Sequence, residues 1–288
     1  MMIIKETAYA KINLGLDVLG LRPDKYHEVA MVMQSVGLAD TLTISENPEL
    51  AVTCDNADLP AGPENLAWKA AVLMGQVANR EPLVKIVLQK RIFVAAGLAG
   101  GSTDAAAVLR GLNRLWQLGL SLDKLERLGA KLGSDVPFCV RGGTSLATGR
   151  GELLTPLPDL PIQTVILAKP RVAVSTPWAY REFDKQKNVQ HPDIQALVAA
   201  VKAQDLEGVL RACGNVLEPV TAAKHPVLQE IKARMREAGV LLALMSGSGP
   251  TMFGIAPDGV VAAKVAAALE GMNLELAVTH TTGRGGQV

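Results

Sequence analysis

A glycine-rich turn in the first half of the chain has residue types that suit the binding of a phosphate group. Small side chains at 95–97 and 99–101 let backbone N–H groups approach an anion, and the helix expected after the turn adds the positive end of its dipole. Ser102 and Thr103 stand at the mouth of that helix, where a hydroxyl can cap the helix or contact a phosphate or its magnesium. The residues assigned to this site are Val94, Ala95, Ala96, Gly97, Leu98, Ala99, Gly100, Gly101, Ser102, Thr103 and Asp104. The alternative is a tight turn that serves only packing, because the spacing fits neither the Walker loop nor the dinucleotide-binding fingerprint.

Two charged residues in other segments also have unusual surroundings. Lys11 lies in the middle of an alternating segment, on the same face as Asn13, where a charge is unusual unless that face lines a wet pocket. Asp135 precedes Val136-Pro137, and the proline favours an extended conformation for the residue before it. A structural role remains open for both, since Lys11 could extend from a sheet edge and Asp135 could cap a helix or form a turn.

The strands and helices that must position these residues do not alternate strictly as βαβ units, which favours an α+β fold over a doubly wound sheet. In the first half, residue periodicity predicts strands at 7–16 and 84–94, two strands within 29–44 broken around 37–40, and helices at 64–79, 104–116 and 121–132. In the second half it predicts a strand at 164–168, several helices up to 238, two strands around 246–250, a helix at 262–269, a strand at 274–282 and a loose tail at 282–288. The helix at 64–79 should bury Leu66, Ala70, Leu73 and Val77.

Composition excludes several classes of protein. Lys and Arg total 29 against 28 Asp and Glu, so no strong field exists to attract nucleic acid or an acidic membrane. The uncharged stretch 238–257 has about the length of a membrane span, but its Ser-Gly-Ser-Gly-Pro centre fits two buried strands and a tight loop better. The first six residues lack the pattern of a secretory signal, so we expect a cytoplasmic protein. Three scattered cysteines and four scattered histidines support neither a disulfide framework nor a structural metal site.

Five ordered segments together resemble the GHMP kinase superfamily. They are Ala10-Lys11-Ile12-Asn13-Leu14, Lys25-Tyr26-His27-Glu28, the glycine-rich loop, Gly133-Ser134-Asp135-Val136-Pro137-Phe138 and Ser246-Gly247-Ser248-Gly249-Pro250-Thr251. Within the superfamily, the chain most resembles the branch that phosphorylates a cytidine diphosphate-linked methylerythritol on the non-mevalonate route to isopentenyl diphosphate. One departure is Phe93, where that branch usually has a proline before the loop.

The resemblance implies a two-lobe fold and an ATP-dependent reaction. An N-terminal lobe similar to ribosomal protein S5 domain 2 would span residues 1–160, and a ferredoxin-like C-terminal lobe would span residues 161–288. Clustered prolines between 156 and 177 agree with a change of lobe near residues 155–165. ATP and magnesium are the implied cofactors. Asp135 would accept or orient the substrate hydroxyl, and Lys11 would keep Asp135 ionised and stabilise the transferred group.

The resemblance also assigns residues to the substrate. The implied substrate-binding residues are Asn13, Tyr26, His27, Tyr180, Gly247 and Ser248, with Asn65 at the nucleotide. Tyr26 and Tyr180 would stack on the cytosine, and His27 would read its edge. The structural alternatives are a loop anchor for Tyr26, a partly buried helix residue for Tyr180, a solvated loop histidine for His27, a hairpin turn for the loop around Gly247 and a helix cap for Asn65. The alternative activities are a kinase for another small alcohol, such as homoserine or mevalonate, or a non-catalytic nucleotide-binding protein. We expect a monomer or a weak homodimer.

Overall fold

The computed structural model describes residues 2–284 and divides them into two compact units. Unit 1 contains the residues up to Ala10, Leu38–Ile92 and Ala99–Gly142, and unit 2 contains Lys11–Gly37, Phe93–Leu98 and the residues from Gly143 onward. The long strands β1 (Ile3–Leu21) and β2 (His27–Glu46) each pass from one unit into the other. The proposed lobe boundary near residue 160 stays a prediction.

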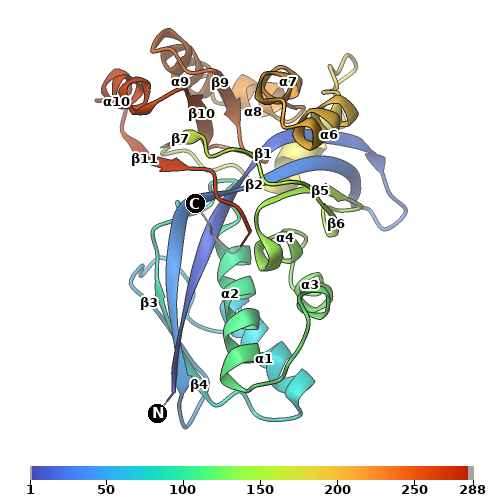
Figure 1. Ribbon diagram of the computed structural model, residues 1–288, viewed down its shortest axis with the longest axis vertical. Helices are drawn as coiled ribbons and strands as arrows, with labels where there is room; N and C mark the ends of the chain where they lie inside the picture. The colour runs from blue at the N-terminus through green and yellow to red at the C-terminus, as the bar shows by residue number, and fades with distance from the viewer. Residues whose placement is uncertain (1, 285–288) are drawn as a thin grey trace. The chain divides into compact units, whose positions relative to one another are not determined.

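Unit 1 combines a small sheet with four helices (Figure 1). The C-terminal part of β2 pairs antiparallel with β4, and β3 pairs parallel with β4. Helices α1 and α2 pack against each other, and α4 packs against both α2 and α3. These elements are β3 (Ala51–Cys54), β4 (Val84–Gln89), α1 (Leu66–Ala78), α2 (Gly100–Leu115), α3 (Leu122–Gly129) and α4 (Val136–Arg141).

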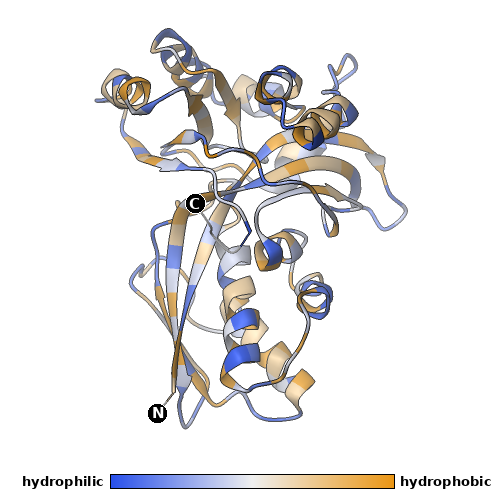
Figure 2. Ribbon diagram, viewed as in Figure 1, coloured by the Kyte–Doolittle hydropathy of each residue, from blue (hydrophilic) through white to orange (hydrophobic). Residues whose placement is uncertain are grey.

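Unit 2 contains an antiparallel sheet in the order β11-β7-β10-β9, with α9 and α10 on one face (Figure 1). Figure 2 shows that β9 and β10 are largely hydrophobic, as expected for strands between a helical layer and the rest of the core. The strands are β5 (Thr144–Thr148), β6 (Leu153–Pro156), β7 (Thr164–Pro170), β8 (Gly214–Asn215), β9 (Leu242–Met245), β10 (Met252–Ala256) and β11 (Leu274–His280). The helices are α5 (Thr176–Phe183), α6 (Ile194–Ala203), α7 (Leu206–Ala212), α8 (Glu218–Lys224), α9 (Val227–Glu237) and α10 (Gly259–Ala268).

The predicted strands and helices occur in the structure in the expected order, including the two strands on either side of Ser246–Pro250, but the sequence analysis missed β3, β5, β6, β8 and α4. Within residues 2–284 no helix is long and apolar enough to cross a membrane. The predicted stripe of α1 was wrong in part, because Leu66 and Leu73 are half-buried and Val77 is exposed. The buried face instead consists of Ala67, Ala70, Ala71, Met74 and Gly75.

The predicted break in the strand at 37–40 was also wrong, because β2 continues through it. A Cβ on Gly37 would lie 2.9 Å from the Thr279 hydroxyl, so the glycine permits a close approach and marks no turn. Asp40 is fully buried and binds charged and backbone partners described below. Gly37 and Asp40 thus make contacts with distant segments from within one continuous strand.

The predicted loose tail was wrong for the residues that the structure describes. Thr282 is buried, its N–H donates to the Ser35 carbonyl at 2.9 Å, and the Arg284 N–H donates to Asp159 at 3.3 Å. These contacts attach the segment after β11 to unit 2. The rest of the predicted tail, residues 285–288, lies outside the described residues.

Candidate active site

The glycine-rich turn adopts a backbone that requires its smallest residue. Gly97 has a φ of +74°, and an added Cβ would lie 2.3 Å from the Ser246 carbonyl oxygen and 3.2 Å from that of Gly249. No other residue fits there, because both the left-handed φ and the available space exclude a side chain. Gly97 therefore permits direct packing between the first glycine loop and the second, within unit 2.

The first turn of α2 in unit 1 leaves its N–H groups available. Ala99 occupies the N-cap position with a φ of +60° and offers no side-chain cap, so Gly100, Gly101 and Ser102 begin the helix without one. Uncapped N–H groups at a helix start attract anions, and Ser102 is only half-buried. The Thr103 hydroxyl instead donates to the Tyr9 carbonyl at 2.7 Å. Thr103 therefore has a structural contact, and Ser102 has the freer hydroxyl.

A buried cluster of three charged side chains lies behind this turn, within unit 1. Lys90 contacts Asp40 and lies 2.5 Å from the Oδ2 atom of Asp104. Asp40 also accepts hydrogen bonds from the backbone N–H groups of Arg91 (2.5 Å) and Ile92 (2.9 Å). Because Asp104 belongs to the second turn of α2, the cluster ties the helix start to the chain that leads into the glycine loop.

Burial controls the ionisation of this cluster. It raises the pKa of Asp104 to about 7, against the opposing effect of Lys90, and the neighbouring Asp40 raises that pKa further. Burial lowers the pKa of Lys90, but the two carboxylates outweigh burial and keep the pKa above its ordinary value. The Oδ1 atom of Asp104 is buried without a hydrogen-bond partner among the described residues. The carboxylate of Asp104, predicted as a nucleotide contact, thus faces Lys90.

Lys11 lies in unit 2 with its ammonium group among polar atoms. It is 4 % exposed, and its Nζ donates to the Asn13 Oδ1 at 2.7 Å and to the Gly97 carbonyl at 3.0 Å. A Cβ on Gly247 would lie 3.5 Å from Lys11 Nζ and 3.6 Å from Asn13 Oδ1. This burial excludes a lysine that extends from a sheet edge. The structure therefore brings Lys11, Asn13 and both glycine loops together.

Asn215, which sequence analysis did not single out, anchors the second glycine loop. Its Nδ2 donates to the carbonyls of Met245 and Gly247, each at 2.8 Å, and its Oδ1 accepts from the Leu217 N–H at 2.9 Å. The Ser246 hydroxyl donates to the Gly97 carbonyl at 3.0 Å. No local spacing pointed to Asn215, because the two carbonyls that its Nδ2 contacts lie 30 and 32 positions further along the chain.

Ser248 lies on the same loop and is buried. Its hydroxyl lies 2.9 Å from that of Thr176, at the start of α5, and its carbonyl accepts from the Thr221 hydroxyl at 3.2 Å. These contacts join the loop to α5 and α8 within unit 2. The predicted binding of substrate by Gly247 and Ser248 stays a prediction.

Asp135 lies in unit 1 at the N-terminus of α4. Its side chain makes no capping hydrogen bond, although the residue occupies the N-cap position, and it is half-buried. A Cβ on Gly133 would lie 4.0 Å from the Ser102 hydroxyl, so the segment of Asp135 lies next to the first turn of α2. The capping role that remained open for Asp135 is therefore absent. Lys11 and Asp135 belong to different units, and their pairing stays a prediction.

The residues predicted to hold a nucleoside lie in unit 2. The rings of His27 and Tyr180 have centroids 4.8 Å apart and an angle of 34° between planes. His27 Nε2 lies 2.9 Å from the Asp184 Oδ1. Tyr26 is 54 % exposed, and the Arg150 guanidinium lies 4.9 Å from its ring centroid. The structure therefore brings His27 and Tyr180 together and adds Asp184 and Arg150, which the sequence did not indicate.

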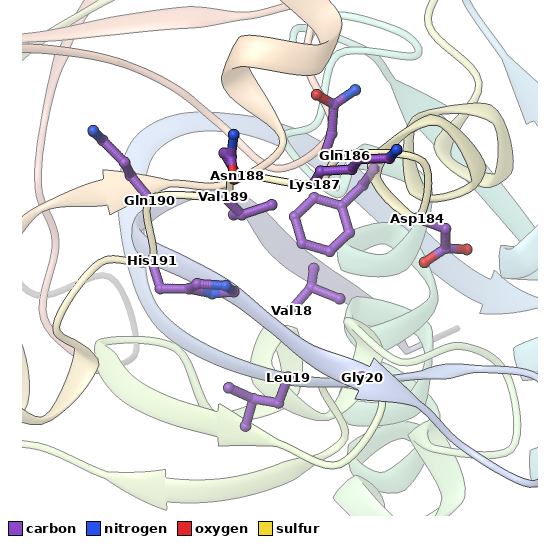
Figure 3. A pocket seen from close by; sticks show the side chains of 11 residues that line it. Val18, Leu19, Gly20, Asp184, Gln186, Lys187, Asn188, Val189, Gln190 and His191 are labelled. Atoms are coloured by element: carbon purple, nitrogen blue, oxygen red, sulfur yellow. The ribbon is translucent and has the colours of Figure 1, made fainter.

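A pocket of about 670 Å³ lies beside Asp184 (Figure 3). Figure 3 shows Val18 and Val189 pointing into it, with Asp184 and His191 at opposite ends. The lining residues are Val18, Leu19, Gly20, Phe183, Asp184, Gln186, Lys187, Asn188, Val189, Gln190 and His191. The pocket is therefore formed by the end of β1, the last residue of α5 and the segment between α5 and α6, all in unit 2.

Asn65 acts as a helix cap. Its Oδ1 accepts from the Ala67 N–H at 2.8 Å, and its Nδ2 donates to the Pro60 carbonyl at 2.7 Å. Both polar ends of the side chain thus have structural partners. The predicted contact of Asn65 with a nucleotide stays a prediction.

Comparisons with known proteins agree with this arrangement. The family model described as GHMP kinases N terminal domain matches residues 65–143, and the one described as GHMP kinases C terminal matches residues 197–273. A 4-diphosphocytidyl-2-C-methyl-D-erythritol kinase of Geobacillus kaustophilus is 52% identical over 86% of each chain. The enzyme of that name from Enterococcus faecalis is 45% identical over 97% of this chain and 99% of its own.

Solved structures point the same way. A crystal structure of 4-(cytidine 5'-diphospho)-2C-methyl-D-erythritol kinase superposes with a TM-score of 0.82 and 35% identity, covering 97% of this chain and 100% of the other. A homoserine kinase from Cytophaga hutchinsonii has a TM-score of 0.76 at 20% identity, which shows a shared fold alone. The two-lobe α+β architecture is that of the GHMP kinases. The chain belongs to the 4-diphosphocytidyl-2-C-methyl-D-erythritol kinase family of this superfamily.

Proposed function

We propose that this chain transfers the γ-phosphoryl group of ATP to the 2-hydroxyl of 4-diphosphocytidyl-2-C-methyl-D-erythritol, a step of non-mevalonate isoprenoid precursor synthesis. The observation that supports this most directly is the convergence of Lys11 and Asn13 with the backbones of Gly97 and Gly247. Phosphoryl transfer requires alignment and charge stabilisation, and a buried ammonium group beside two glycine loops can supply both. The protein would act in the cytoplasm on small molecules, as a monomer or a weak homodimer.

The ATP phosphates would bind the N–H groups at the start of α2 and the glycine-rich turn. Gly97 and the uncapped turn at Gly100 to Ser102 fit this role, because they offer backbone donors without obstructing side chains. Lys11 has three N–H donors, of which two contact Asn13 and Gly97. The third N–H would point to the transferred phosphoryl group or to Asp135.

Asp135 would take the proton of the 2-hydroxyl as the new O–P bond forms. The bond from the γ-phosphorus to the β,γ-bridging oxygen breaks in the same step, and ADP leaves. A carboxylate without a capping partner is suited to this role, since no helix N–H competes for it.

Magnesium would be held mainly through the phosphates. Among residues 2–284 no group of three or more His, Cys, Asp or Glu side chains is arranged to bind a metal ion. Mg²⁺ usually keeps several waters and takes its other ligands from substrate phosphates, so few protein ligands are required. The Ser102 hydroxyl is the side chain at the helix start that fits as a ligand, because Asp104 faces Lys90 and the Thr103 hydroxyl is engaged. The ion would neutralise charge on the phosphate oxygens.

The experiment that tests this function measures ADP release with ATP, magnesium and a panel of alcohols. The panel holds the cytidylyl substrate, homoserine, mevalonate and a sugar. We expect kcat/KM for the cytidylyl substrate to exceed the others by at least about 100-fold, since the others have no base to bind. NMR of the product should place the new phosphate on the 2-oxygen. Faster turnover of homoserine or mevalonate would refute the proposal.

A further inference from the structure

The segment between α5 and α6 is fastened at both ends by contacts between a histidine and an aspartate. At one end, Asp184 Oδ1 lies 2.9 Å from His27 Nε2, at the start of β2. At the other end, His191 Nδ1 lies 2.6 Å from Asp17 Oδ1, on β1. We call residues 184–191 the strap. Figure 3 shows the two ends of the strap on opposite sides of the pocket.

The two contacts have the same chemistry but different neighbours. His27 packs against the Tyr180 ring at a centroid distance of 4.8 Å and follows Tyr26 directly, so it belongs to the proposed nucleoside site. Asp17 Oδ1 accepts a second hydrogen bond from the Val18 N–H at 2.8 Å, which holds it to β1. The His191 side chain is 50% exposed, whereas that of His27 is 12% exposed. Only the contact of Asp184 therefore reaches a residue of the nucleoside site.

Asp184 restricts the tautomer of His27. An ionised carboxylate can only accept a hydrogen bond, so the neutral imidazole must carry its proton on Nε2 to satisfy this contact. Nδ1 then carries a lone pair and can only accept. The hydrogen bonds described for residues 2–284 give this Nδ1 no partner, and the imidazole contacts both the Asp184 carboxylate, through Nε2, and the Tyr180 ring.

We propose that Asp184 is a positioning residue that makes the nucleoside site select a base edge with a hydrogen-bond donor, through the tautomer of His27. This inference rests on the proposed function. Cytosine presents an amino group at the position where uracil presents a carbonyl oxygen. An accepting Nδ1 pairs with the amino group, whereas the lone pairs of Nδ1 and the uracil oxygen repel each other. Asp184 thus selects cytidine over uridine without touching the base.

The test compares cytidine- and uridine-linked substrates with the wild-type chain and with Asp184→Asn. An asparagine side chain can donate as well as accept, so it accommodates both tautomers of His27. We expect the wild-type chain to prefer the cytidine substrate over the uridine substrate by about 100-fold in kcat/KM. In the variant this cytidine-to-uridine ratio should fall about tenfold. The loss should lie in KM, with kcat for the cytidine substrate within about twofold of wild type, because the reacting hydroxyl is remote from the base.

Asp17→Asn is the matched control, since it changes the same kind of contact at the other end of the strap. It should leave the cytidine-to-uridine ratio within about twofold of wild type. An equal loss in Asp17→Asn and Asp184→Asn would assign the effect to the strap as a whole and overturn the inference. An unchanged ratio in Asp184→Asn would also overturn it while leaving the proposed function intact. Absence of turnover with the wild-type chain would refute both.

A readout that is independent of activity follows the tautomer itself. The chain has four histidines, so ¹⁵N-histidine NMR gives few resonances, and His27→Gln assigns those of His27. At a pH where His27 is neutral, the wild-type chain should show a protonated Nε2 and an unprotonated Nδ1. Asp184→Asn should shift these resonances toward a mixture of tautomers, and Asp17→Asn should not. A wild-type Nδ1 that carries the proton would overturn the inference.

Discussion

The surroundings of the α2 start in unit 1 and the proposed nucleoside residues in unit 2 are built from opposite kinds of contact. Beside the α2 start, the side chains of Lys90, Asp40 and Asp104 are each at most 6% exposed. Among the proposed nucleoside residues and their partners, Tyr26 is 54 % exposed and the Asp184 side chain is 46% exposed. Removal of one partner from a buried ion pair is strongly destabilising because it leaves an unpaired buried charge, whereas the loss of an exposed contact costs little. Substitutions beside the α2 start should therefore affect folding or turnover, and those among the proposed nucleoside residues should affect substrate choice.

The largest effect is expected from Asp135→Asn. The amide cannot accept the hydroxyl proton, so kcat should fall by about two to four powers of ten, with ATP affinity nearly unchanged. Steady-state kinetics and nucleotide titration measure the two quantities separately. Near-normal turnover in the variant would remove Asp135 from the mechanism.

Among the substitutions considered, Lys90→Met should cause the largest loss in the free energy of unfolding. Removal of the ammonium group leaves two buried carboxylates without a cation, which costs about 3–5 kcal/mol in the free energy of unfolding. Arg91→Met is the control, because Arg91 is 65% exposed beside Asp55 and its loss should cost under about 1 kcal/mol. Urea unfolding of both variants makes the comparison. Equal losses in the free energy of unfolding would show that burial does not make the Lys90 contacts more important for stability than the Arg91 contact.

Asp104 should make stability depend on pH. Burial raises its folded pKa to about 7 from the ordinary 3.8, so the folded state binds the extra proton between these values. Stability from this group therefore increases as pH falls from 8 to 5, since the folded state then holds more protons than the unfolded state. Relative to Asp104→Asn, the wild-type chain should gain about 1–3 kcal/mol over that range. A difference between the two proteins that does not change with pH would contradict the assignment.

The smallest effect is expected among the proposed nucleoside residues. Tyr26→Ala should raise KM for the cytidylyl substrate by about tenfold or more, because a lost stacking contact costs about 1–3 kcal/mol. KM for ATP and the free energy of unfolding should hardly change. A parallel increase in the KM for ATP would show that Tyr26 does not belong to the nucleoside site.

The segments of the candidate site could be singled out because they are short and distinctive. Residue type and spacing indicated the glycine-rich turn and Lys11 with Asn13, and the family resemblance indicated the loop around Gly247. These three segments meet within unit 2, while the roles of their residues stay predictions. Errors arose where a residue serves a distant partner. Gly37 and Asp40 were interpreted as a turn because both residue types favour turns, yet each responds to a contact elsewhere in the fold.

Local residue order was sufficient for most of the strands and helices, the glycine-rich turn and the kinase family, because each depends on neighbours within a few positions. Tertiary structure alone decided that Lys90 pairs with Asp40, 50 residues earlier in the chain, and that Asp184 reaches His27 across 157 residues. Periodicity carries no information about such pairs, since loop closure can bring together charges at almost any separation. The burial that raises the pKa of Asp104 exists only after that closure.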